Sequence, residues 1–233
     1  MNSPVSAPIV VLEFEDVLAD VRAARLLALR GALAGDGIAV DESAFDSRCT
    51  GLSVAAAVRL MFGRVGACAD DTAVDLCVLR ALRDFGARVS RGVSLAPGAH
   101  AFVRNAAGCA RLGLVAGVPR PDVDAVLSLA ALGDAFECIV TSEDDARMAG
   151  TAGLFARTLT QMGRRGGLPR ENPAALVASK NAIVAARAAA MYTVVVGPSS
   201  SVHECRGAVH FDSLEGVHVS EVVRLVAVPG ATT

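Results

Sequence analysis

The hydrophobic pattern begins with a short apolar run near the start of the chain. From Ile9 to Phe14 every residue except Glu13 is apolar, and the run shows no alternation with polar residues. A strand that is buried on both faces of a parallel sheet has this pattern. The sequence therefore predicts a central β-strand here, and the residues that follow it should lie at the edge of the sheet where α/β proteins bind ligands.

A helical period replaces the strand pattern over the next seventy or so residues. Helices are expected at about 23–33, 41–48, 53–62 and 71–88, and no clear strand separates them. Asp41, Ser53 and Asp71 are suitable N-caps for the last three helices, because their side chains can accept hydrogen bonds from free backbone N–H groups. This arrangement indicates an α-helical insertion, residues 21–97, placed directly after the first strand.

Strand and helix patterns alternate through the rest of the chain. Strands are expected at 112–116, 137–141, 174–178, 192–196 and 208–211, with helices at 121–132, 154–162 and 182–190 and a surface loop at 163–173. Alternation at this spacing favours βαβ units and a parallel sheet. The predicted fold is α/β, with a Rossmann-like core of residues 1–20 and 98–233 in which helices flank the sheet.

Composition narrows the classes of function. The net charge is −2 and there is no basic run, so nucleic acid is not an expected partner. No apolar stretch approaches the length of a membrane span and no signal peptide is evident, so no membrane association is expected. The six cysteines are scattered without a C-x-x-C pair, which is typical of reduced thiols, and we expect a cytoplasmic location.

Two carboxylates at the end of the first strand are the main candidates for chemistry. Glu13 and Glu15 are two residues apart, so the strand period should place them on the same side of the chain, and Leu18 and Asp20 follow. This stretch resembles the first motif of the haloacid dehalogenase superfamily, in which an apolar strand leads to two aspartates two residues apart. The resemblance implies a nucleophile at Glu13 that takes a phosphoryl group, a general acid/base at Glu15, and Mg²⁺ between them.

The helical insertion strengthens the resemblance. Thr50-Gly51-Leu52-Ser53 before a helix, and Leu95-Ala96-Pro97-Gly98 before the return to the core, resemble the branch of β-phosphoglucomutases and phosphoglycolate phosphatases. The resemblance implies that residues 21–97 form a helical cap over the active site.

The remaining family motifs are substituted at the positions that carry chemistry. Ala116 stands where the family has Ser or Thr, and Met148 or Ala149 stands where it has Lys. The run Ala185–Met191 fixes the register of the fourth motif, and this places Val177, Ala178 and Ser179 where the family has acidic metal ligands. Mg²⁺ would be left with Glu13 and Glu15 alone, although it demands near-ideal oxygen ligands.

Two hypotheses about function follow. The first is an eroded phosphoryl-transfer site, catalytically silent or weak, in a chain that acts as a binding or assembly component without metal or cofactor. Its partner is expected to be a protein or a small phosphorylated ligand, with Gly117, Arg120 and Lys180 as candidate ligand-binding residues. The alternative is an Mg²⁺-dependent phosphomonoester hydrolase or phosphomutase that uses Glu13 as an unusual nucleophile.

The single lysine of the chain suggests how such a site could lack a metal. The chain has 22 Lys plus Arg residues, and Lys180 is the only lysine. Two carboxylates about 4 Å apart repel by roughly 4 kcal/mol at an effective dielectric constant near 20. We expect the Lys180 ammonium to offset this repulsion by bridging to Glu13 or Glu15, unless Lys180 is simply a solvated residue ahead of a helix.

Overall fold

The fold is a parallel sheet with helices on both faces, as the sequence predicts. A computed structural model describes residues 7–66, 70–144, 151–168, 172–198 and 209–227. Its six described strands are all parallel, in the order β3-β2-β1-β4-β5-β6. The strands are β1 (Ile9–Glu13), β2 (Arg111–Val115), β3 (Cys138–Val140), β4 (Ala174–Val177), β5 (Tyr192–Val196) and β6 (Val209–Phe211).

Helices lie in the connections from β1 through β5, and a further helix follows β6. The α-helices are α1 (Arg22–Ala34), α2 (Glu42–Ala44), α3 (Val54–Arg64), α4 (Asp71–Val89), α5 (Ala99–Ala106), α6 (Arg120–Leu129), α7 (Thr151–Gly166), α8 (Lys180–Ala188) and α9 (Val219–Ala227). Shorter helical turns are η1 (Phe45–Cys49, π-helical), η2 (Gly133–Ala135) and η3 (Ser142–Asp144). In the ranges given above, no helix is long and apolar enough to cross a bilayer.

Strand β1 lies at the centre of the sheet because both of its faces are apolar. It pairs with β2 on one side and with β4 on the other, so that Leu12 lies opposite Leu114 and Leu176. All five residues of β1 are buried. The C-terminal ends of β1, β2 and β4 therefore lie side by side.

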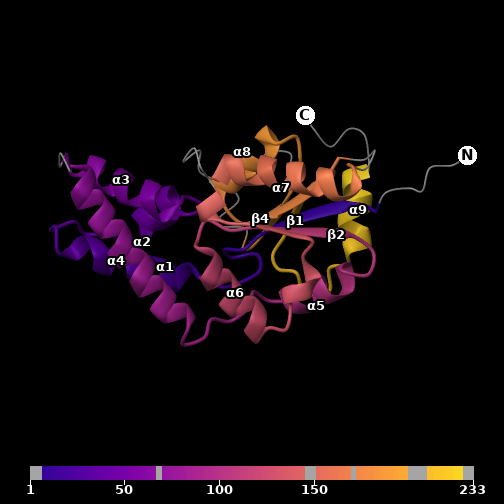
Figure 1. The fold of residues 1–233 in the computed structure, drawn as a ribbon, viewed down its shortest axis with the longest axis horizontal. Coiled ribbons are helices and arrows are strands. Elements are labelled where there is room, and N and C mark those ends of the chain that lie inside the picture. The colour runs from indigo at the N-terminus through magenta and orange to yellow at the C-terminus, as the bar shows by residue number, and fades with distance from the viewer. Residues whose placement is uncertain (1–6, 67–69, 145–150, 169–171, 199–208, 228–233) are drawn as a thin grey trace, which may run out of the picture.

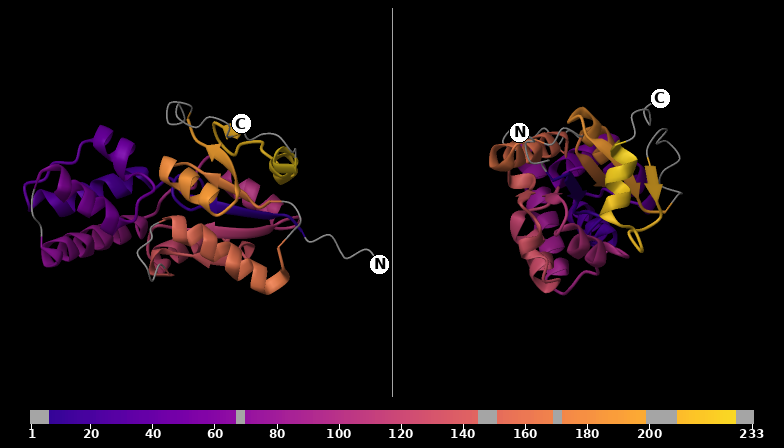
Figure 2. Two further views of the ribbon diagram at one scale, coloured as in Figure 1. Left: turned by 90° about the horizontal axis from the view of Figure 1, so that it is seen from above. Right: turned by 90° about the vertical axis from the view of Figure 1, so that its right-hand side faces the viewer.

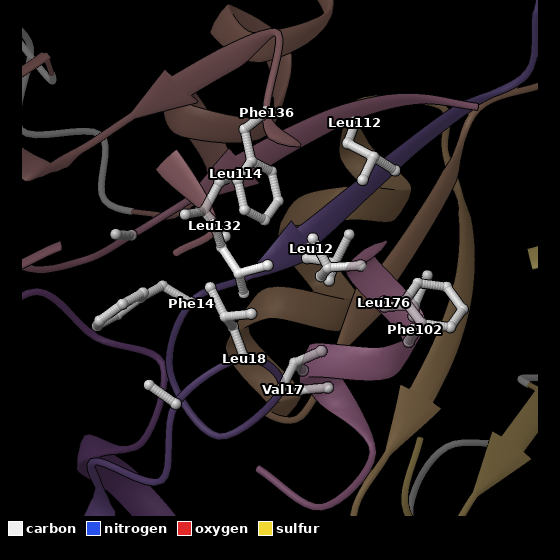
Figure 3. Packing of buried hydrophobic residues seen from close by; sticks show 14 of the residues in the cluster. Leu12, Phe14, Val17, Leu18, Phe102, Leu112, Leu114, Leu132, Phe136 and Leu176 are labelled. Atoms are coloured by element: carbon white, nitrogen blue, oxygen red, sulfur yellow. The ribbon is translucent and has the colours of Figure 1, made fainter. Parts of the chain in front are cut away.

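The two faces of the sheet carry separate apolar cores. Val10 and Leu12 point toward α5, α6 and α9, where they pack with residues such as Phe102. Figure 3 shows this side of the sheet, with leucines of the strands packed against aromatic and aliphatic residues of the surrounding helices and loops. Ile9 and Val11 point the other way, toward α7 and α8. Because side chains alternate along a strand, Glu13 lies on the α8 side of the sheet.

Helices α1 to α4 form a block at one end of the molecule, as Figures 1 and 2 show. The block has an apolar cluster of its own, which includes Leu33, Phe45 and Met61. Ser53 caps α3 as expected, whereas α4 is capped by Asp70, one residue before the expected Asp71, because the Asp70 side chain accepts a hydrogen bond from the Ala73 N–H. The division into a core of 1–20 and 98–233 and a cap of 21–97 stays a prediction.

The largest local difference from the expected elements is at the end of α7. This helix continues to Gly166, whereas the sequence predicted a loop from Gly163. The Arg111 guanidinium donates hydrogen bonds to the carbonyls of Met162 (2.6 Å) and Gly167 (2.7 Å). Carbonyls at a helix C-terminus lack partners within the helix, so a cation from a neighbouring strand stabilises this extra turn.

Candidate active site

Glu13 is held by the donors at the end of the neighbouring strand β4. Its Oε2 accepts a hydrogen bond from the Ala178 N–H at 2.8 Å, and its Oε1 accepts one from the Ser179 hydroxyl at 3.1 Å. Ser179 is also the N-cap of α8 and accepts from the Ala182 N–H at 3.1 Å. Glu13 is only 2% exposed. Both carboxyl oxygens are therefore occupied by groups of the chain itself.

Burial changes the protonation of Glu13. Removal from water and the nearby charge of Glu15 together raise the pKa of Glu13 to about 8, although the hydrogen bonds from Ala178 and Ser179 lower it. At neutral pH the carboxyl group of Glu13 is mostly protonated. A neutral carboxyl is a poor nucleophile and a poor ligand for a hard cation.

Glu15 reaches the opposite neighbour of β1, the strand β2. Its Oε1 accepts a hydrogen bond from the Gly117 N–H at 2.9 Å, and Glu15 is 4% exposed. A Cβ at position 117 would lie 3.0 Å from this oxygen, so the absence of a side chain at Gly117 permits the contact. The two glutamates were expected on the same side of the chain. They diverge because the strand ends at Glu13 and its period no longer applies.

Arg25 completes the surroundings of Glu15 and was missed in the sequence analysis. It comes from α1 and is 7% exposed. Its Nη1 lies 3.9 Å from Glu15 Oε1, and its Nη2 donates to the Leu52 carbonyl at 2.6 Å. The signal for it was present in the sequence, because Arg25 interrupts the buried helical stripe that continues with Ala28, Leu29 and Ala32.

Asp16 lies in a tight loop directly after β1. Its backbone has a φ of 62°, and its N–H donates to the Ala19 carbonyl at 2.8 Å. Burial raises the pKa of Asp16 to about 6, although the charge of Arg25 lowers it. Among the described residues, Asp16 Oδ1 is the one buried side-chain oxygen or nitrogen without a hydrogen-bond partner. Asp16 is therefore the least satisfied acid of the site.

Two of the five predicted site residues do not join this cluster. Lys180 is exposed at the first position of α8, and none of the ion pairs between described residues joins it to Glu13 or Glu15. The expected Lys180 bridge is wrong, because Ser179 and the Ala178 N–H occupy that side of Glu13. Arg120 pairs with Asp124 at 2.7 Å on the exposed surface of α6.

The helical block covers the site directly. The Asn181 side chain donates a hydrogen bond to the Thr50 carbonyl at 2.8 Å, which ties the start of α8 to the loop before α3. In the same loop a Cβ on Gly51 would lie 2.1 Å from Ser179 Oγ. The backbone of this loop is therefore packed against the residue that holds Glu13.

The residues present do not fit Mg²⁺, which the family resemblance implies. Ser179 and two backbone N–H groups direct hydrogens at the oxygens of Glu13 and Glu15, and Arg25 places a positive charge beside Glu15. Ala178 supplies no carboxylate where the family has a metal ligand. Within the described part of the chain, no group of three or more His, Cys, Asp or Glu residues is arranged to hold a metal ion.

Of the two other substituted motifs, the structure describes the second and not the third. Ala116 follows β2, is fully buried, and packs in the apolar core on the α5 side of the sheet. Met148 and Ala149, together with the neighbouring Arg147, lie outside the described residues. The hydroxyl of the second family motif is therefore replaced by apolar surface, while the position of the third is not described.

Comparison with known proteins identifies the fold. No protein-family model matches the chain, and no curated protein is similar to it in sequence. CbbY from Rhodobacter sphaeroides, solved in complex with phosphate, is 18% identical with a TM-score of 0.78 over 93% of this chain and 99% of that chain. The β-phosphoglucomutase from Clostridium difficile is 14% identical with a TM-score of 0.77 over 94% and 98%.

A predicted phosphoglycolate phosphatase from Haemophilus somnus is also similar. It is 14% identical, with a TM-score of 0.68 over 91% of this chain and 96% of that chain. These similarities cover nearly the whole of each protein, and at such identities they concern the fold. The chain has the fold of the haloacid dehalogenase superfamily, in the form shared by β-phosphoglucomutases and phosphoglycolate phosphatases.

Proposed function

We propose that this chain is a haloacid dehalogenase-fold protein whose phosphoryl-transfer site is eroded, and that it acts as a binding or assembly component. The observation that carries the proposal is the state of Glu13. Its two carboxyl oxygens accept hydrogen bonds from Ala178 and Ser179, and it is buried under the helical block. A nucleophile must be ionised and must reach the phosphorus atom. Burial opposes ionisation of Glu13, and the two hydrogen bonds hold its carboxyl group at the end of β4, away from a substrate.

The length of the Glu13 side chain also opposes catalysis. Glu13 is one methylene longer than the aspartate of the family motif, and a misplacement of about 1 Å can cost a hundredfold in rate. Here the additional reach brings the carboxyl group to the donors at the end of β4. Glu15 is likewise bound to the Gly117 N–H, so this backbone donor is already used and is not open to a phosphate oxygen.

The alternative is an Mg²⁺-dependent phosphomonoester hydrolase or phosphomutase with Glu13 as nucleophile. Its support is the fold, since the similar proteins include a phosphoglucomutase and a phosphatase. Under this alternative the helical block would have to open, and Glu13 would have to exchange its two hydrogen bonds for a metal ion.

Release of phosphate from an aryl phosphate, measured with and without Mg²⁺, separates the two functions. The unaltered protein and Glu13→Gln are compared, because Gln keeps the size of the side chain and cannot form an acyl phosphate. We expect no release that depends on both Mg²⁺ and Glu13. Release that requires both would contradict the proposal and establish the alternative.

The binding role needs a test of its own. Size-exclusion chromatography with light scattering measures whether the chain associates with itself, and titration with inorganic phosphate measures whether it binds a small anion. Self-association, or phosphate binding without turnover, supports a binding component. A strict monomer that binds no phosphate would count against this part of the proposal.

A further inference from the structure

Arg25 lies where the helical block meets the carboxyl edge of the sheet. Among the residues that the structure describes, it is the only basic side chain that is buried. We propose that Arg25 is an internal cation that takes the place of a divalent metal beside Glu15 and joins the helical block to the sheet. Lys180 was the internal cation expected from the sequence, and Arg25 lies beside Glu15 instead.

The contacts of Arg25 connect three segments that are distant in the sequence. The side chain comes from α1, donates to the Leu52 carbonyl in the loop before α3, and lies 3.9 Å from Glu15 after β1. Glu15 in turn accepts from the Gly117 N–H at the end of β2. A continuous polar path therefore runs from the block, through one buried ion pair, to the sheet.

The distribution of charge explains why a cation is needed at this point. Glu13, Glu15 and Asp16 bring three carboxyl groups to the end of one strand, and all three are buried or half-buried. A buried carboxylate is strongly disfavoured unless an opposite charge or several hydrogen bonds compensate it. Glu13 has two hydrogen bonds from its own chain, whereas Glu15 has one and depends on Arg25 for the remainder.

The charge of Arg25 also acts on Asp16, but the ion-pair distance is the one to Glu15. On its other side Arg25 lines a hollow between α1, η1, α3 and α4, with an empty volume of about 300 Å³ that is partly open to solvent. The other residues that line this hollow are all apolar, namely Ala28, Leu29, Phe45, Val54, Ala57, Ala81 and Phe85. The guanidinium has no second carboxylate on this side, which favours its position at Glu15.

This inference does not depend on the proposed function. It concerns stability and metal binding, both of which are measured without a substrate. A chain that released phosphate in the absence of Mg²⁺ would contradict the silent site and leave the internal cation intact.

Thermal unfolding of two variants of the same helix tests the ion pair. Arg25→Gln removes the charge beside Glu15, while Arg30→Gln removes an arginine of α1 that donates to the Val40 carbonyl at 2.9 Å. Loss of one partner of a buried pair leaves the other uncompensated, so we expect Arg25→Gln to lower the Tm by about 6 °C or more. Arg30→Gln is expected to lower it by less than about 3 °C. Equal losses would overturn the inference.

A double-mutant cycle shows whether the falls in Tm come from the ion pair between Arg25 and Glu15 or from lost packing alone. Glu15→Gln is combined with Arg25→Gln, and the fall in Tm of the double variant is compared with the sum of the two single ones. The inference predicts a clearly smaller fall than the sum, because each single variant leaves one buried charge without a partner. Losses that add in full would contradict it.

Addition of Mg²⁺ tests the metal side of the inference. A ligand that binds only the folded state raises its Tm. With Arg25 in place, millimolar Mg²⁺ is expected to leave the Tm of the unaltered protein unchanged. A rise in Tm of the unaltered protein with Mg²⁺, absent in Glu15→Gln, would overturn the inference.

Discussion

Gly51 lies so close to Ser179 that a Cβ at position 51 would be 2.1 Å from the serine hydroxyl oxygen. Gly51 has a φ of +75°, a conformation that L side chains rarely adopt. The helical block therefore approaches the sheet by its backbone, at the residue that donates a hydrogen bond to Glu13. The backbone of the block is therefore packed against the residue that holds Glu13.

Replacement of Gly51 should therefore disturb the site and lower stability. In Gly51→Ala the left-handed backbone costs about 1–2 kcal/mol, and displacement of Ser179 adds to this. We expect the free energy of unfolding in urea to fall by roughly 3 kcal/mol or more. Gly37→Ala is the matched control, since Gly37 has a φ of +71° and no atom within 4 Å of an added Cβ. A loss as small as that of the control would show that the close approach is unimportant.

A second prediction concerns the ion pair at the other end of the sheet. Arg111 binds Glu137 through two hydrogen bonds of 2.7 Å each, and it also donates to the carbonyls of Met162 and Gly167. Lysine cannot reproduce this planar arrangement of donors, so Arg111→Lys should lower the free energy of unfolding by about 1–3 kcal/mol.

The control for Arg111→Lys is an arginine with a single exposed partner. Arg120 pairs with Asp124 on the surface of α6, with both side chains about half exposed. Such pairs contribute little, and Arg120→Lys should change the free energy of unfolding by less than about 0.5 kcal/mol. If the two variants lose equally, the geometry at Arg111 does not matter for stability.

A third prediction is an unusual dependence of stability on pH. The pKa of Glu13 is about 8 in the folded chain and near 4.5 when unfolded. Between these values the folded state holds a proton that the unfolded state has released, so stability falls as pH rises, by up to about 1.4 kcal/mol per pH unit. Asp16 adds a fall of the same sign between its ordinary pKa of 3.8 and about 6.

Glu13→Gln isolates the contribution of this residue to the pH dependence. The amide can accept from the Ala178 N–H and donate to the Ser179 hydroxyl, so its packing is retained. Urea unfolding from pH 5 to pH 8 should show the variant gaining stability over the unaltered protein as pH rises. Parallel curves for the two proteins would mean that Glu13 keeps an ordinary pKa.

The architecture was largely accessible from the sequence, because it depends on periodic burial. The run from Ile9 to Leu12 predicts a central strand, and the helical spacing after Asp20 predicts the block between the first two strands. The end of α7 was predicted poorly, since a surface loop was expected from Gly163 and the helix continues to Gly166. The bonds from Arg111 that stabilise this turn come from a strand about fifty residues away, and local sequence does not contain them.

The site was predicted in outline, with the wrong cation. The ends of adjacent parallel strands meet at one edge of the sheet, which brings Gly117 to Glu15, whereas Glu13 turns to the other neighbour, β4. Lys180 was selected for its position in the chain, but the first residue of a helix projects its side chain outward here, and the N-cap Ser179 takes the inner position. Arg25 belongs to the helical block, and the position of this block relative to the sheet depends on tertiary packing. Its contact with Glu15 could therefore not be predicted from the local sequence.

The proposed function requires that Glu13 is protonated at neutral pH, whereas a nucleophile would be ionised. Infrared difference spectroscopy measures this protonation state directly. Spectra of the unaltered protein and of Glu13→Gln at pH 7 differ by the signal of this one carboxyl group. We predict the carbonyl stretch of a protonated carboxylic acid, which disappears as the pH is raised past about 8. The bands of an ionised carboxylate at pH 7 would contradict the silent site.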